Sequence, residues 1–358
     1  MVLSISLENN NLEAIVIVGG GVAGLSCLNA LLDRGIPALL LEGSKVGMPK
    51  MCGEFIAPEV VAALEKWEIN SIQKIREASF NAKNKSFHLV FPKLAGGFSR
   101  SEVELHLAER AKKMKGRIRE DFQIVKIVPA THNTPYIFTS QTGEEIIVKT
   151  AIFATGKFAQ TILAPIKKKY AGIKFHFENI IAPETLLMFS LPNAYLGIVP
   201  ISETMSNCAC LMKSNGVDLK NQFYGMVAQH KQLRTIFAEK KCNAVSWLEG
   251  QAPNFELKKL PDWPHAFWIG DALASLHPAI GSGFAHGVSS AILAAELYCL
   301  NQPNVYLKLS NQNAKIKYHI GKMMHLLLQY PRVGDFAIPL AQSQPWILNV
   351  LLHKIGYT

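Results

Sequence analysis

Three glycines close to the N-terminus have the spacing of a nucleotide-binding turn. Gly19, Gly21 and Gly24 follow the pattern G-x-G-x-x-G, directly after a β-branched run over residues 14–18. In this pattern the first glycine permits a tight turn, the second lets the backbone approach a pyrophosphate, and the third lets a helix pack close to a strand. Unpaired N–H groups at the start of the following helix then attract the phosphates.

The residues after these glycines complete the unit. Val22 and Ala23 open a stretch in which leucines recur at helical spacing, and a second apolar strand over residues 38–41 ends in Glu42. A carboxylate at this distance from the glycines binds adenosine ribose hydroxyls and repels a 2′-phosphate. We therefore predict that the site takes FAD or NAD rather than NADP, with Val22 and Ala23 beside the ligand.

A second turn rich in glycine occurs late in the chain, after a short apolar strand over residues 266–269. The aspartate at the end of that strand can accept hydrogen bonds from a polyol. The Pro-x-x-Gly-x-Gly stretch that follows offers N–H groups to an electron-rich ring edge at a helix start. A ligand held by both turns must be long, as FAD is. The predicted binding residues of this second turn are Gly270, Asp271, Pro278, Gly281 and Gly283.

Three segments together resemble the FAD-dependent group that joins aromatic hydroxylases, flavin halogenases and geranylgeranyl reductases. They are the two glycine turns and the pattern R-x-x-[hydrophobic]-E-x-x-L, present as Arg100, Val103, Glu104 and Leu107. The resemblance implies that Glu42 binds the adenosine ribose and that Arg100 lies along the cofactor. It also implies that Asp271 meets the ribityl or pyrophosphate portion, and that the turn from Gly281 to Gly283 flanks the isoalloxazine.

Shorter motifs favour different branches of this group. Residues 50–54 read K-x-C-G-E, which resembles geranylgeranyl reductases, where the cysteine lies by the flavin. Tyr195 and Pro200 fit the Y-x-W-x-F-P form of those enzymes, but Gly197 replaces the tryptophan. Both tryptophans of the halogenase form W-x-W-x-I-P are missing, so halogenation is not favoured.

Three side chains are candidates for chemistry. Cys52 follows Lys50, and a thiolate beside a cation can contact or protonate a flavin or substrate; the alternative is a small buried core residue. Tyr195 either lines a substrate pocket or fills a core. His277, beside the second glycine turn, could donate a proton; the alternative is a capping or solvent-facing histidine.

The composition excludes several classes of protein. The chain has 358 residues, 49% hydrophobic and 18% charged, so it is not disordered, collagen-like or a coiled coil. Its formal charge of +10 favours anions in general, namely phosphorylated cofactors, acidic carrier proteins, membrane surfaces and nucleic acid, and does not choose among them. Six scattered cysteines form no pair of C-x-x-C motifs, so no metal site is predicted. Residues 1–11 lack a signal-peptide pattern, and we expect a cytoplasmic location.

We expect an α/β fold with a Rossmann-like, three-layer FAD-binding domain, an inserted antiparallel-sheet α+β substrate domain, and a helical C-terminal tail. The FAD-binding domain is predicted to be discontinuous, from residues 1–165 and 262–300. The substrate domain is predicted from residues 166–261, with a possible strand from 86–92. Residues 301–358 form the predicted helical segment.

The predicted function is an FAD-dependent oxidoreductase, foremost an NAD(P)H-dependent monooxygenase that hydroxylates an aromatic or apolar small molecule. NADH or NADPH is expected to visit the flavin transiently, because no second complete G-x-G-x-x-G is present. One alternative is a double-bond reductase of the geranylgeranyl reductase type, acting on a lipid-like or carrier-bound substrate. Another is a flavoprotein that acts on a partner protein. We expect no nucleic acid and at most peripheral membrane contact.

Overall fold

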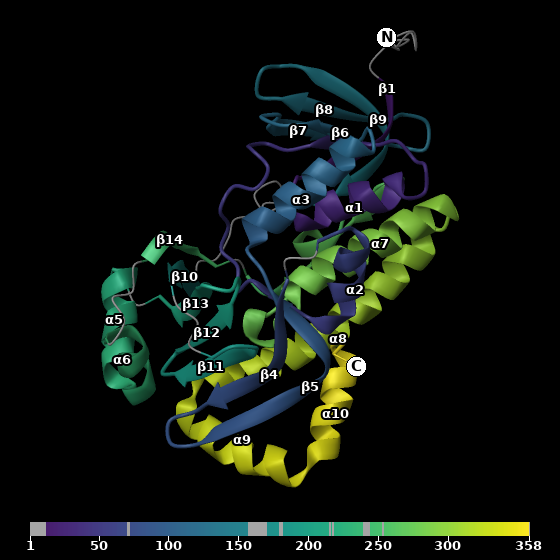
Figure 1. The fold of residues 1–358 in the computed structure, drawn as a ribbon. Coiled ribbons are helices and arrows are strands. Elements are labelled where there is room, and N and C mark those ends of the chain that lie inside the picture. The colour runs from purple at the N-terminus through teal and green to yellow at the C-terminus, as the bar shows by residue number, and fades with distance from the viewer. Residues whose placement is uncertain are drawn as a thin grey trace.

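The computed structural model describes residues 12–69, 72–156, 170–178, 182–214, 216, 218–238, 244–252 and 254–357. Two large sheets lie at different ends of the molecule, with helices between and beside them (Figure 1). Residues 1–11, on which the expected location partly rests, are outside the described ranges. Among the helices in these ranges, none is both long enough and apolar enough to cross a bilayer.

The first sheet is parallel at its centre and continues into an antiparallel hairpin. Its elements and the helices on it are β1 (Leu12–Val18), β2 (Leu39–Leu41), β6 (Arg117–Arg119), β7 (Ile124–Val128), β8 (Tyr136–Ser140), β9 (Glu145–Phe153), β16 (Ala266–Trp268), α1 (Val22–Leu32), α3 (Arg100–Lys113) and α7 (Gly283–Cys299). The strand order is β6-β2-β1-β9-β8-β7, and β16 pairs in parallel with β9.

The central strand of this sheet is buried on both faces, as its apolar run predicts. Side chains alternate along a strand. Ile15 and Ile17 of β1 therefore enter a core with α1, α3 and α7, whereas Val16 and Val18 enter a second core with the β7–β8 hairpin. The three layers expected for this half of the molecule are present.

The second sheet is mainly antiparallel. It consists of β3 (Phe55–Ile56), β4 (Gln73–Asn81), β5 (Ser86–Gly97), β10 (Tyr170–Glu178), β11 (Thr185–Leu191), β12 (Ala194–Pro200), β13 (Met205–Lys213) and β14 (Ala244–Gln251), in the order β14-β10-β13-β12-β11-β4-β5-β3. Helices α5 (Leu219–Gln229) and α6 (Lys231–Ala238) cover one face. Residues 86–92 lie in β5, and β3 and β4 join the same sheet although they precede residue 166.

The C-terminal segment is helical, as expected, with α8 (Pro303–Gln329), α9 (Pro331–Ser343) and α10 (Pro345–Lys354). Each of these helices begins with proline, which suits a first helical position because it needs no N–H there. Leu328 of α8 packs against Tyr195 and Met188, on the face of the second sheet opposite α5 and α6. The remaining short elements are α2 (Pro58–Lys66), β15 (Glu256–Leu257), η2 (Gly270–Ala272), β17 (Ala274–Ser275) and η3 (Pro278–Ile280).

Candidate functional site

The first glycine turn, between β1 and α1, has the geometry that its spacing predicts. Gly19 has a φ of 110°, and a Cβ on Gly24 would stand only 1.9 Å from the Gly19 carbonyl oxygen. A Cβ on Gly21 would instead meet nothing closer than side-chain atoms at 3.6 Å. The turn is thus closed where strand and helix meet and open on the Gly21 side. That open side is where phosphates would approach the start of α1.

Glu42 lies directly beside this turn. Its Oε2 accepts a hydrogen bond from the backbone N–H of Gly20 at 2.6 Å, and its Oε1 accepts from the N–H and the hydroxyl of Ser44 at 3.0 and 2.8 Å. These bonds hold the carboxylate in one orientation at the end of β2. Oε2 accepts only the one bond from Gly20 and keeps a second lone pair, so a ribose hydroxyl could still bind there.

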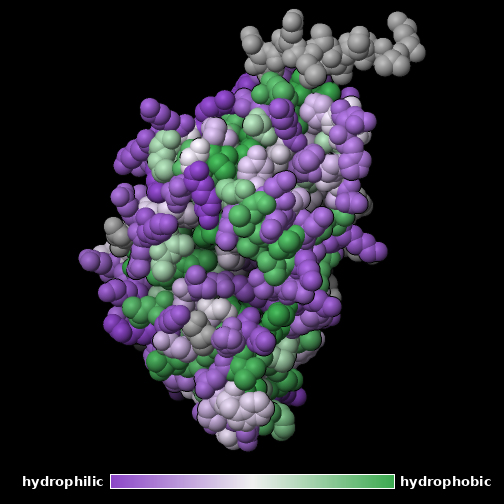
Figure 2. All heavy atoms as spheres, turned by 90° about the vertical axis from the view of Figure 1, so that its right-hand side faces the viewer, coloured by the Kyte–Doolittle hydropathy of each residue, from purple (hydrophilic) through white to green (hydrophobic). Residues whose placement is uncertain are grey.

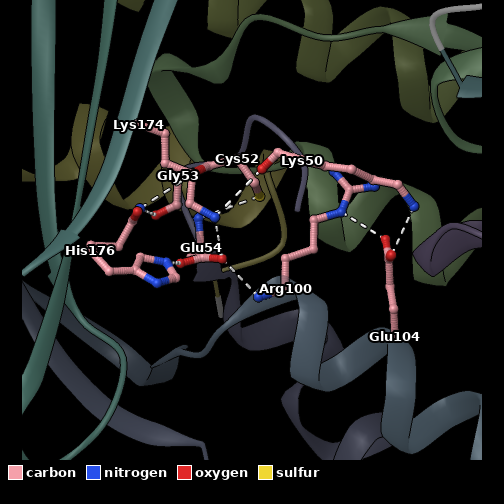
Figure 3. Close-up of polar contacts among 9 residues, drawn as sticks. Lys50, Cys52, Gly53, Glu54, Arg100, Glu104, Lys174 and His176 are labelled. Carbon is pink, nitrogen blue, oxygen red and sulfur yellow. Dashed lines mark hydrogen bonds and ion pairs between the residues drawn. The ribbon is translucent and has the colours of Figure 1, made fainter. Parts of the chain in front are cut away.

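Two cations and a buried carboxylate face the open side of the turn. Arg100 Nε donates to Glu104 Oε1 at 2.9 Å, and Lys50 Nζ donates to Glu104 Oε2 at 2.8 Å (Figure 3). The nearest atoms to a Cβ on Gly21 would be Arg100 Nη2 at 3.6 Å, Glu104 Oε1 at 3.7 Å and Lys50 Nζ at 3.8 Å. The formal charge of this group is positive. An anionic pyrophosphate would complement it.

The second glycine turn meets the first in space. A Cβ on Gly270 would lie 3.0 Å from the Cβ of Ala23 in the first turn of α1, and 3.5 Å from the Cα of Gly287 in α7. Burial alone would lower the pKa of Arg100, but the nearby Cys52, Glu104 and Asp271 raise it above its ordinary value. Arg100 is therefore within electrostatic reach of Asp271, and one ligand could contact both turns.

The far end of the second turn is tightly packed on one side and open on the other. Gly281 has a φ of 61°, and its Cβ would lie 2.5 Å from the ring of Phe55. The hydroxyl of Tyr357 donates to the carbonyl of Ile280 at 2.9 Å. A Cβ on Gly283 would meet nothing within 4 Å, so the start of α7 has free space beside it.

Four buried side-chain hydroxyls lack hydrogen-bond partners within the described part of the chain, and two of them lie at the glycine turns. These two are Thr155 Oγ1, next to the first glycine turn, and Ser282 Oγ, in the second. Buried polar atoms are nearly always hydrogen-bonded, so each exception needs an explanation. A polar ligand that runs between the turns would supply both partners. The residues present therefore fit a long dinucleotide.

The loop that carries Cys52 is held by a buried carboxylate. Glu54 Oε1 accepts from Lys174 Nζ at 2.5 Å and from the N–H of Arg100 at 2.9 Å, and Glu54 Oε2 lies 2.6 Å from His176 Nε2 (Figure 3). Burial opposes ionisation of Glu54, but its contacts with His176 and Lys174 outweigh burial and lower its pKa. The glutamate therefore stays charged and links this loop to α3 and β10.

Cys52 itself lies in the middle of this arrangement. The Glu54 N–H donates to Cys52 Sγ at 3.4 Å, and Asn207 Nδ2 of β13 donates to the carbonyls of Cys52 and Gly53 at 3.3 and 2.9 Å. The thiol thus belongs to a well-anchored loop near Arg100. Phe55, which packs on the second glycine turn, follows three residues later.

Tyr195 and His277 come together on the other side of the second turn. Two further side chains join them, His325 of α8 and Phe255. The Tyr195 hydroxyl lies 3.4 Å from His325 Nδ1, and the ring centroids of His277 and His325 are 4.7 Å apart. The ring of Phe255 is 4.8 Å from that of His277. We call Tyr195, Phe255, His277 and His325 the aromatic–histidine cluster.

The burial of the His277 imidazole determines its protonation state. Neither of its ring nitrogens has a hydrogen-bond partner among the residues that the structure describes, although the side chain is only 7% exposed. Burial, and then the charges of His325 and Lys322, lower the pKa of His277 to about 4. A neutral imidazole near pH 7 is a hydrogen-bond acceptor or a base, and not the charged acid that a proton donor would need.

Several residues of the site lie outside the motifs found in the sequence. Lys174 and His176 are two residues apart on β10, so both point to one face of the strand, and this spacing is their sequence signal. Lys258 donates to the carbonyls of Asp271 and Gly156, and burial lowers its pKa. His325 lies inside a long helical stretch with no motif around it.

Within the described ranges, no group of three or more His, Cys, Asp or Glu side chains could hold a metal ion.

Comparisons with known proteins identify the fold. The sequence matches no protein-family model and no curated protein. In structure, the chain is similar to a geranylgeranyl bacteriochlorophyll reductase-like protein from Thermoplasma acidophilum (TM-score 0.76, 17% identity, 92% of this chain and 91% of that one). It is also similar to a flavin-dependent brominase (TM-score 0.74, 15% identity, 97% and 94%) and to PqsL of Pseudomonas aeruginosa, a probable FAD-dependent monooxygenase (TM-score 0.74, 10% identity, 90% and 98%).

These similarities extend over nearly the whole of each chain, so the fold is that of FAD-binding proteins with a Rossmann-type domain. The expected fold class is confirmed. The three neighbours represent the reductase-like, halogenase and monooxygenase branches that the motifs resemble. Because one fold carries all three activities, the choice among reactions depends on the residues of the site.

Proposed function

We propose that this protein is an FAD-dependent oxidoreductase, and that its main reaction is the NAD(P)H-dependent hydroxylation of a small apolar or aromatic molecule. The observation that carries the proposal is the contact between the two glycine turns at Ala23 and Gly270. This contact forms one cradle with an acidic residue at one end and an open helix start at the other. FAD has the length, the ribose hydroxyls and the pyrophosphate that such a cradle would complement.

Different residues of the chain would bind different parts of the cofactor. Glu42 would accept hydrogen bonds from the adenosine ribose, and Gly21, Arg100 and Lys50 would bind the pyrophosphate. Asp271 would accept hydrogen bonds from the ribityl hydroxyls. The backbone from Gly281 to Gly283 would lie along the isoalloxazine, which supplies the electron transfer when FAD is bound.

The aromatic–histidine cluster would bind the substrate. Its rings offer apolar contact, and the neutral imidazole of His277 and the Tyr195 hydroxyl can hold one polar group, such as a phenol hydroxyl. His277 would accept a hydrogen bond from that hydroxyl and make the ring more electron-rich. The packing of α8 against this cluster keeps water out of the site.

A double-bond reductase is the second candidate, and the position of Cys52 favours it. The thiol lies in a rigid loop that Glu54, Asn207 and Arg100 hold beside the cradle. A thiol at such a place could deliver the proton that, together with a hydride, reduces the double bond of an alkene. The missing tryptophan at Gly197 argues against a substrate of the prenyl type.

The proposal is tested first by cofactor binding. Purified apoprotein is titrated with FAD, and bound flavin is measured by its visible absorbance and quenched fluorescence. We expect Glu42→Ala to weaken FAD about tenfold or more, because a hydrogen bond to a charged group contributes roughly 1.5–3 kcal/mol. Glu249→Ala, in β14 of the second sheet, is the control and should leave FAD affinity unchanged. Folded protein that does not bind FAD would refute the proposal.

The reaction is tested by turnover with and without oxygen. Loaded enzyme, NADH or NADPH, and either a phenol or a prenyl alkene are incubated in air and anaerobically. Oxygen-dependent hydroxylation of the phenol supports the monooxygenase, and anaerobic reduction of the alkene supports the reductase. Cys52→Ala separates the two further. A hydroxylase should keep most of its activity, whereas a reductase that uses the thiol as proton donor should lose it.

A further inference from the structure

The last two long helices turn large apolar side chains toward solvent. Phe336 is 79% exposed, Trp346 63% and Leu340 56%. Their spacing is regular, since Val333, Phe336 and Leu340 fall on one side of α9, and Trp346 and Val350 fall on one side of α10. We call these five side chains the C-terminal apolar face.

The opposite sides of the same helices are firmly packed. A Cβ on Gly334 would lie 3.0 Å from the Cβ of Ala82, and Asp335 accepts hydrogen bonds from the N–H groups of Asn84 and Lys85 at 2.9 and 3.0 Å. Leu352 of α10 is buried. The apolar face is therefore presented outward by a fixed scaffold. Large apolar side chains held exposed in this way mark a surface for interaction.

The C-terminal segment that carries this face has a net positive charge. Residues 301–358 contain six Lys and Arg and only one acidic residue, Asp335, whose carboxylate is bonded to the β4–β5 turn. Lys85 and Arg332 line an open recess together with Phe336, Leu340 and Asp335. Hydrophobic side chains lie among hydrophilic ones toward the lower end of the molecule in Figure 2, the end at which Figure 1 shows α9.

We propose that the C-terminal apolar face binds the surface of a bilayer that contains anionic lipids. Helices that lie in a membrane interface combine an apolar side with Lys and Arg around it, and tryptophan is enriched at that depth. A second copy of the chain is a poorer partner, because two copies would bring like charges together across the contact. This inference goes beyond the proposed function and does not depend on it.

The test is co-sedimentation of the full-length protein with vesicles. Vesicles of phosphatidylcholine alone are compared with vesicles that also contain phosphatidylglycerol. We expect binding to the anionic vesicles, weaker binding in high salt, and a loss of at least tenfold in partitioning for the double variant Phe336→Ser/Leu340→Ser. The matched control is Val125→Ser, since Val125 is 62% exposed on β7 at the far end of the molecule (Figure 1). This control should bind like the unchanged protein.

Two checks make the result decisive. Thermal melting and circular dichroism establish that each variant is folded, which is expected because the replaced side chains are exposed. Vesicles with brominated acyl chains should quench part of the tryptophan fluorescence, and Trp346→Phe should remove that part. Equal binding by the double variant, equal binding to neutral vesicles, or no binding at all would overturn the proposal. A dimer that the double variant dissociates, without vesicle binding, would assign the face to a second copy.

Discussion

Gly270 lies against Ala23, so close that a Cβ on Gly270 would stand 3.0 Å from the Cβ of Ala23. These residues belong to the two glycine turns and are separated by most of the chain. The contact packs η2 on the first turn of α1. It makes the late turn part of the same cradle as the early one, which is what a long cofactor requires.

The close approach of α1 to β1 depends on Gly24. We expect Gly24→Ala to destabilise the fold by about 2 kcal/mol or more, because the new Cβ would overlap the Gly19 carbonyl oxygen. FAD affinity should fall with it, since the turn must open to relieve the overlap. Denaturant unfolding and FAD titration measure both effects. The control is Gly225→Ala in α5, where a Cβ meets nothing within 4 Å, and a slight gain in stability is expected. Equal behaviour of the two variants would contradict this account.

The stability effects of replacing the buried residues Glu54 and Lys174 should be strongly coupled. Lys174→Met removes one of the two cationic partners of the buried Glu54 carboxylate and is expected to cost about 3–5 kcal/mol. The double variant with Glu54→Gln should recover much of this loss, and a double-mutant cycle from urea unfolding measures the difference. If the two single losses simply add, the pair does not act as a unit.

The same carboxylate makes stability depend on acid. The pKa of Glu54 is lowered below 4.5 in the folded protein, so its contribution is present above that pH and is lost as pH falls through the lower folded value. Glu54→Gln should therefore flatten the stability profile below pH 4.5. A profile as steep as that of the unchanged protein would count against this role.

Two buried histidines act in a different pH range. Burial lowers the pKa of both His277 and His286 from 6.5 to about 4. The unfolded chain thus takes up protons below pH 6.5 that the folded chain does not. The free energy of unfolding should fall between pH 6.5 and 4 by about 1.4 kcal/mol per pH unit for each histidine. His286→Leu should remove one such slope. Urea melts at pH 7 and pH 5 provide the comparison.

Tyr195→Phe tests the aromatic–histidine cluster. The variant keeps the ring and removes only the hydroxyl that lies 3.4 Å from His325. We expect kcat/KM for a phenol to fall about tenfold, as for a lost hydrogen bond of roughly 1.5 kcal/mol, with FAD affinity unchanged. Tyr224→Phe, at a half-exposed position on α5, is the control. Unchanged kcat/KM in Tyr195→Phe would place the tyrosine in the core and not in the substrate site.

The amino-acid sequence by itself determined the parts of this protein that depend on local geometry. The glycine spacing, the apolar run over residues 14–18 and the position of Glu42 predicted a β1–α1–β2 unit, because tight turns and buried parallel strands restrict residue types over short distances. The two glycine turns indicated FAD because a ligand held by both of them must be long. The roles of individual side chains remain predictions.

Only the tertiary structure decided which distant side chains meet. Lys174 and His176 reach Glu54 because β10 and the Cys52 loop lie side by side, although they are more than 100 residues apart. His325 joins Tyr195 because α8 packs across the second sheet. Such contacts arise from long-range packing, and no pattern in the chain shows which distant side chains meet. The neutral state of His277 likewise follows from its burial and not from its neighbours in sequence.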